Sequence, residues 1–101
     1  MRHDQSFTPF PVLETAERLG QRIRSARKAQ KLTLLQLEKN CRIHRTTLGR
    51  LERGEPGVSL GVFLTVLDSL QELSDVELIL SQPDKPKHKR VVPPPVLKRD
   101  F

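Results

Sequence analysis

The stretch from Arg42 to Gly54 combines side chains whose chemistry suits the reading of nucleic-acid bases. It runs RIHRTTLGRLERG. If residues 45–53 form a helix, Leu48 and Leu51 point inward and the polar side chains point outward. The outward-facing side chains are those of Arg45, Thr46, Thr47 and Arg50. Arginine donates paired hydrogen bonds to guanine in the DNA major groove, and threonine reaches bases or phosphates there. This stretch therefore predicts a DNA-reading surface.

Positive charge is concentrated in two parts of the chain. The 101 residues carry a net charge of +6. Residues 14–55 hold eleven Lys or Arg against five Asp or Glu, and residues 83–101 hold six against two. Residues 56–82 hold four acidic residues and no basic ones. This asymmetry favours a polyanionic partner, the alternative being a basic protein without a nucleic-acid partner.

Several other classes of protein are disfavoured by composition. The chain has no apolar run of roughly 18 residues, so we expect no membrane association. Residues 1–6 lack the apolar stretch of a signal peptide. A single cysteine, Cys41, excludes an internal disulfide and fits a reducing cytoplasm, where we expect it to be a small core residue.

Candidate residues for catalysis are sparse. His3, His44 and His88 are scattered and have no second ligand at metal spacing. The five glycines are isolated and form no phosphate-cradling loop. We therefore predict no enzymatic activity, no metal site and no cofactor.

The first helix is expected to begin between Pro11 and Thr15, with Thr15 as its N-cap. Leu19, Ile23 and Ala26 recur at spacings of four and three, which predicts one buried stripe along this helix. Residues on the other sides of the helix should face solvent.

Two short helices joined by a turn should follow. Thr33 is the predicted N-cap of the second helix, and Gln36 is its capping-box partner. The turn is expected over residues 40–44 and the third helix over residues 45–53. Gly54 is expected to end that helix.

A fourth helix should begin after Ser59 and be mostly buried. Its broad apolar face consists of Leu60, Phe63, Leu64, Val66, Leu67 and Leu70. The next apolar segment, Val76 to Leu80, fits either a fifth helical turn or a short strand. A strand there would need a partner, such as the same segment of a second chain.

Four stretches carry a resemblance to a known family. They are Gly20 to Arg24, Lys31 to Leu37, Ile43 to Gly54, and Val58 to Leu60 with the leucines that follow. Together they resemble the Xre/Cro-CI helix-turn-helix DNA-binding domains, over about half of the chain. The resemblance implies an all-α, compact bundle of four or five helices, of the lambda-repressor-like type, that binds double-stranded operator DNA as a homodimer.

The resemblance also implies roles for individual residues. Base reading falls to Arg45, Thr46 and Arg50, with Thr47 beside them. Phosphate contacts fall to Thr33, His44 and Arg53. Arg27 and Glu52 correspond to a structural ion pair that ties the first helix to the end of the third.

Three positions depart from the family pattern. Leu34 stands where the family commonly has Gln, which puts one DNA contact in doubt. Glu38 stands where a small residue is common, so the helices must approach less closely there, or Glu38 must turn outward toward Arg42 or Arg45. Arg42 stands where Gly is common. Because a left-handed non-Gly residue costs about 1 kcal/mol, we expect the turn to be shaped differently.

The predicted organisation is an N-terminal arm at residues 1–12, a DNA-binding and dimerisation domain at 13–81, and a basic, Pro-rich, disordered tail at 82–101. The segments after the third helix are similar to HipB-like antitoxins, which repress their own operon and bind HipA-like kinase toxins. We therefore predict a sequence-specific transcriptional repressor that is also an antitoxin. The alternative is a stand-alone Xre-type regulator or a restriction-modification controller protein without a toxin partner.

Overall fold

Residues 7–84, the part of the chain that the computed structural model describes, contain five α-helices. They are α1 (Phe10–Ala29), α2 (Leu34–Cys41), α3 (Arg45–Glu52), α4 (Leu60–Ser69) and α5 (Leu73–Val76). No strand occurs within these residues, so the all-α fold class is confirmed. Val76 to Leu80, for which a strand was one alternative, forms the end of α5 and the turns after it.

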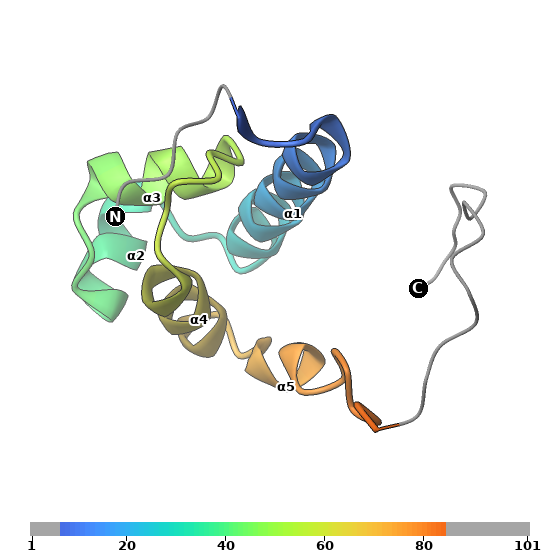
Figure 1. Cartoon of the computed structure of the whole chain (residues 1–101). Coiled ribbons are helices and arrows are strands. Elements are labelled where there is room, and N and C mark those ends of the chain that lie inside the picture. Colours follow the sequence, from blue (N-terminus) through green and yellow to red (C-terminus); the bar gives the residue numbers. More distant parts are fainter. Residues whose placement is uncertain (1–6, 85–101) are drawn as a thin grey trace.

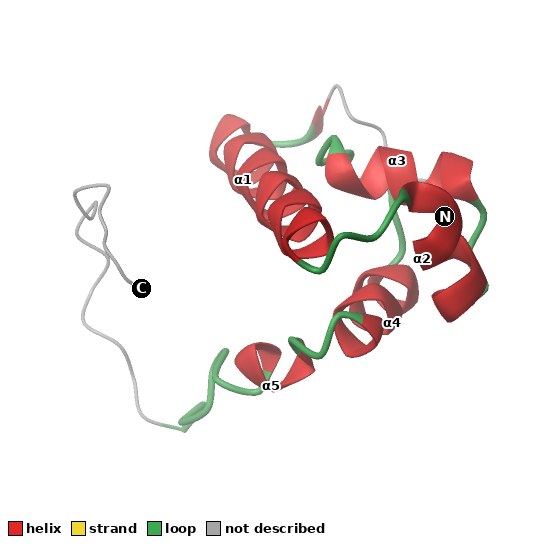
Figure 2. Cartoon of the chain, turned by 180° about the vertical axis from the view of Figure 1, so that it is seen from behind, coloured by secondary structure: helices red, strands yellow, loops and turns green. Residues whose placement is uncertain are grey.

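The first four helices enclose the core, and α5 extends from it. The long α1 lies against α3, and α2 packs against both α3 and α4 (Figure 1). The short α5 follows α4 and projects away from the other helices, as the view from behind also shows (Figure 2). The chain therefore holds α3 between α1 and α2, with one side left for solvent.

Each of the first four helices contributes to one apolar core. Its buried members are Ile23, Leu37, Leu48, Leu51, Val66 and Leu70. The predicted inward positions of Leu48 and Leu51 are confirmed. The α4 face is less buried than predicted, because Leu60 is 68% exposed. Leu60 is the first residue after the cap of α4, and its side chain faces solvent.

The prediction for the start of α1 is wrong. The helix begins at Phe10, with Pro9 at the N-cap position and Pro11 in the first turn. Proline suits this place because the first N–H groups of a helix have no intrahelical acceptor to lose. Thr15 therefore lies inside the helix, where its hydroxyl accepts a hydrogen bond from Arg18 Nη2 at 3.3 Å. Of the predicted arm, residues 1–6 lie outside the described part.

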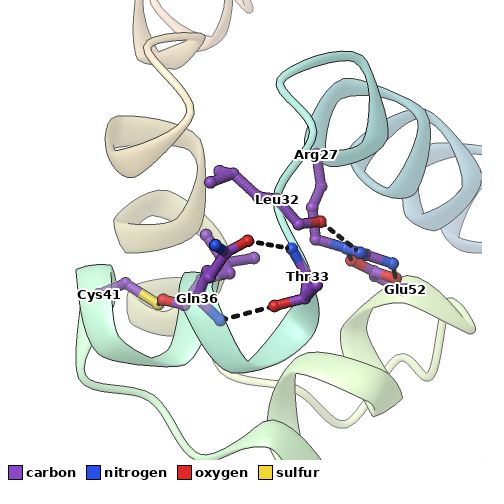
Figure 3. Close-up of polar contacts among 7 residues, drawn as sticks. Arg27, Leu32, Thr33, Gln36, Cys41 and Glu52 are labelled. Atoms are coloured by element: carbon purple, nitrogen blue, oxygen red, sulfur yellow. Dashed lines mark hydrogen bonds and ion pairs between the residues drawn. The ribbon is translucent and has the colours of Figure 1, made fainter.

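The start of α2 follows its capping chemistry. The Thr33 hydroxyl accepts a hydrogen bond from the Gln36 N–H at 3.1 Å, and Gln36 Oε1 accepts one from the Thr33 N–H at 2.8 Å (Figure 3). This reciprocal capping box confirms the predicted start.

The turn between α2 and α3 differs from the prediction. We expected Arg42 to avoid the left-handed region, but it has φ 60° and ψ 38° there. The Arg42 N–H donates to the Glu38 carbonyl at 2.7 Å, which closes the end of α2. The turn therefore keeps its left-handed residue and accepts a local backbone cost of about 1 kcal/mol.

The end of α3 is a Schellman motif centred on Gly54. The Gly54 N–H donates to the Leu51 carbonyl at 2.9 Å, and the Glu55 N–H donates to the Arg50 carbonyl at 3.1 Å. Gly54 has φ 80°, and a Cβ there would lie 2.5 Å from the Glu17 Cα. Only glycine meets both demands, so the predicted stop at Gly54 is confirmed.

A buried ion pair joins α1 to the last turn of α3. Arg27 Nε lies 2.7 Å from Glu52 Oε2, and Nη2 donates to Oε1 at 3.1 Å. The third Arg27 nitrogen, Nη1, donates to the Leu32 carbonyl at 2.8 Å (Figure 3). The side chains are only 9% and 8% exposed. This bidentate contact fixes the orientation of α3 relative to α1.

Candidate nucleic-acid interface

The solvent side of α3 is formed by polar and basic side chains. Thr46, Arg50 and Arg53 follow one another at spacings of four and three, so they share one stripe of the helix. Arg45 lies beside this stripe and is exposed, whereas Thr47 is half-buried at its other border. Because Leu48 and Leu51 anchor the opposite side in the core, the stripe has a fixed direction. We call these five residues, Arg45, Thr46, Thr47, Arg50 and Arg53, the α3 polar face.

A carboxylate holds two of the arginines on this face. Arg50 Nε donates to Glu55 Oε1 at 2.9 Å. Arg53 donates to Glu55 Oε2 from Nε at 3.2 Å and from Nη2 at 3.1 Å. The hydrogen bond from Arg50, and then that from Arg53, lowers the pKa of the Glu55 carboxyl below its ordinary value. Glu55 is therefore ionised near neutral pH and offsets part of the local positive charge.

Arg45 has a carboxylate neighbour of its own. Glu38, on α2, places Oε1 3.2 Å from Arg45 Nε. Their alignment does not make a hydrogen bond, and this buried oxygen accepts none from any described residue. Glu38 thus turns toward Arg45, one of the two arginines expected from the sequence, and the contact is a looser ion pair than the one at Glu55.

Two of the predicted phosphate-binding residues cap helices. His44 is the N-cap of α3, and its Nδ1 accepts a hydrogen bond from the Thr46 N–H at 3.0 Å. In a neutral imidazole this leaves Nε2–H as a donor. The Thr33 hydroxyl accepts from Gln36 and keeps its own proton for donation. Both side chains are exposed at helix N-termini, where backbone dipoles favour anions.

A comparison of the sequence with known protein families agrees with this geometry. Residues 18–78 match the sequence profile of the family described as helix-turn-helix domain, which is more than half of the chain. The chain belongs to the helix-turn-helix domain family. No curated protein matches it. In this helix-turn-helix domain, α2 and α3 with the turn between them form the motif, which points to DNA binding.

Two residues of the helix-turn-helix surface were missed by sequence reasoning. Gly49 lies on α3 between Arg45 and Arg53, and a Cβ there would lie 3.3 Å from Arg53 Nη1. Glu55 lies beyond the helix, yet its carboxylate binds Arg50 and Arg53. A signal for Glu55 existed, since an acidic residue directly after the Schellman glycine lies within reach of the last helical turn.

The described residues offer little for other chemistry. No group of three or more His, Cys, Asp or Glu within residues 7–84 is placed to hold a metal ion. Burial raises the pKa of the Cys41 thiol, whose Sγ donates to the Leu37 carbonyl at 3.1 Å. This thiol is therefore a poor nucleophile. Over the same stretch, none of the helices combines the length and the apolar character needed to span a membrane.

Proposed function

We propose that this helix-turn-helix protein is a sequence-specific transcriptional repressor that reads operator DNA with the α3 polar face. One observation carries this proposal. Leu48 and Leu51 fix α3 in the core while Arg45, Thr46 and Arg50 point to solvent on the opposite side. A short helix anchored in this way can enter the major groove and bring side chains to base edges.

The proposed contacts divide into two classes. Base reading belongs to Arg45, Thr46, Thr47 and Arg50, and phosphate binding belongs to Thr33, His44 and Arg53. Arg50 is 42% exposed on its side chain and can reach outward. A bidentate contact from arginine to guanine discriminates by about 1–3 kcal/mol. Phosphate contacts fix the register of the protein without adding sequence information.

We also propose that the repressor acts as a homodimer on half-sites about one helical turn, roughly 34 Å, apart. Support comes from Leu78, Ile79 and Leu80, three consecutive apolar side chains that are exposed after α5. A second copy would remove them from water. Sedimentation should show a dimer for the full chain and a monomer when all three residues are replaced by serine. A monomeric wild type would contradict the proposed homodimer.

The DNA-binding proposal is tested by selecting duplexes from a random library with the full chain. Mobility shifts then compare the selected duplex with random duplexes. Arg50→Ala should lower affinity for the selected duplex by about 5- to 100-fold and change random binding far less. Arg22→Ala, on the exposed side of α1, is the control. Equal losses on both duplexes for Arg50→Ala reject the proposal.

The antitoxin role is the more specific alternative. It was predicted partly from the apolar segment at Val76 to Leu80, for which a helical turn and a strand were both open, and that segment forms the end of α5 and the turns after it. No other feature of residues 7–84 favours a toxin partner over a stand-alone regulator or a controller protein. Purification of the tagged chain from its native host distinguishes them, because an antitoxin brings a kinase-like protein with it and a stand-alone regulator does not.

A further inference from the structure

Arg50 and Glu55 are joined both through the backbone and through their side chains. The Glu55 N–H donates to the Arg50 carbonyl at 3.1 Å as part of the Schellman motif. Arg50 Nε in turn donates to Glu55 Oε1 at 2.9 Å. The backbone hydrogen bond fixes the position of the Glu55 backbone, and the side-chain hydrogen bond fixes the position of the Arg50 guanidinium. The orientation of Arg50 is therefore determined by the end of its own helix.

This arrangement uses only one of the three guanidinium nitrogens. Nη1 and Nη2 of Arg50 form no hydrogen bond with any residue of the described range. They are the two nitrogens that an arginine presents end-on to O6 and N7 of a guanine. Because the side chain is already ordered, less conformational entropy is lost when it meets a base.

The same carboxylate also restrains Arg53. Glu55 Oε2 accepts hydrogen bonds from Nε and Nη2 of Arg53. Two arginines thus share one negative charge at the end of α3. Phosphates are present in every duplex, so a carboxylate that competes for these arginines weakens binding to all DNA. A contact between Arg50 and the matching base pair is then needed to compensate for this loss of affinity.

We propose that Glu55 is a specificity-determining positioning residue, which holds Arg50 ready for a guanine and limits the attraction of Arg50 and Arg53 to unrelated DNA. The inference rests on the proposed reading of double-stranded DNA by α3. It predicts that the ratio of selected to random affinity falls when Glu55 is replaced, and a solvated surface ion pair of little energetic weight would leave that ratio unchanged.

The test uses the full chain with Glu55→Gln, which keeps the size of the side chain, and Glu55→Ala, which removes the head group. Glu17→Gln is the matched control. Its backbone packs against Gly54, its carboxylate is exposed, and it forms no ion pair with another described residue. Affinities are measured for the duplex selected by the wild type and for random duplexes, over a range of salt concentrations.

Both Glu55 variants should bind random DNA more tightly, with a salt slope that steepens by about 0.9 for each additional phosphate that the protein neutralises. Their ratio of selected to random affinity should fall about fivefold or more, while Glu17→Gln keeps the wild-type ratio. A wild-type ratio in the Glu55 variants overturns the inference, as does an equal fall in Glu17→Gln. A wild type without sequence preference overturns the proposed function itself and the inference with it.

Discussion

Gly20 of α1 lies directly against the Glu52 carbonyl at the end of α3. A Cβ on Gly20 would lie 2.5 Å from that oxygen and 2.7 Å from the Leu51 carbonyl oxygen. Both are backbone atoms, which cannot move aside as a flexible side chain can. The backbones of α1 and α3 therefore approach each other closely, and this approach sets the angle at which α3 presents its polar face.

Replacing Gly20 by alanine should destabilise the protein by about 1–3 kcal/mol, because the added methyl group forces α1 and α3 apart. Helix propensity alone predicts the opposite sign, a gain of about 1 kcal/mol. Gly61→Ala on α4 is the control, since its Cβ would meet no atom closer than 3.9 Å. Urea unfolding should show a lower free energy of unfolding for Gly20→Ala only. A higher free energy of unfolding for both variants would contradict the close approach of α1 and α3.

Breaking the Arg27–Glu52 pair should be costly. Glu52→Ala leaves the buried Arg27 guanidinium with only the Leu32 carbonyl as a partner. Removing one member of a buried pair costs about 3–5 kcal/mol, whereas replacing both by apolar residues is far less harmful. Unfolding free energies should therefore be lowest for Glu52→Ala and largely restored when Arg27→Met is added. If Glu52→Ala lowers the free energy of unfolding by less than about 1 kcal/mol, the pair behaves as an exposed ion pair and the prediction is wrong.

Replacing Glu38 should increase the stability of the protein. Its buried Oε1 accepts no hydrogen bond, and such an unsatisfied group costs about 1–3 kcal/mol. The ion pair with the exposed Arg45 offsets less than about 1 kcal/mol. Glu38→Ala should raise the free energy of unfolding by about 0.5–2 kcal/mol. Lys39→Ala, an exposed neighbour on α2, is the comparison variant that removes a charge without removing a buried group. A net loss of unfolding free energy for Glu38→Ala would show that the ion pair dominates.

Local chemistry made much of the helix-turn-helix motif predictable. The Thr33–Gln36 capping box and the stop at Gly54 each depend on residues within a few positions. The inward leucines of α3 follow from helical periodicity. These signals predicted the start of α2 and both ends of α3 to within one residue, and with them the direction of the α3 polar face. The end of α2 was predicted less well, because the helix continues to Cys41 and the turn was expected to begin at residue 40.

The missed features depend on the meeting of distant segments or on ambiguous signals. Nothing near Gly20 indicates the Glu52 carbonyl that requires a glycine, because that contact forms only after folding. A proline such as Pro11 can either block a helix or lie in its first turn, and here it lies in the first turn of α1. Arg42 keeps its left-handed conformation because the hydrogen bond to Glu38 and the packing of two helices outweigh a small local cost. Glu55 was missed although its partners are close in the sequence, because its contacts with Arg50 and Arg53 depend on the path of the chain after Gly54.

The lowered pKa of Glu55 predicts a specific acid dependence. A carboxyl group whose pKa is lower in the folded state stabilises the fold above its unfolded value near 4.5, and this contribution is lost as pH falls through the lowered folded pKa. NMR titration of the DNA-free protein should place the Glu55 midpoint below 4.5. Arg50→Ala and Arg53→Ala should each raise that midpoint, because hydrogen bonds from both arginines lower the pKa of this carboxyl. A midpoint that neither substitution moves would show that the arginines do not hold this carboxylate in solution.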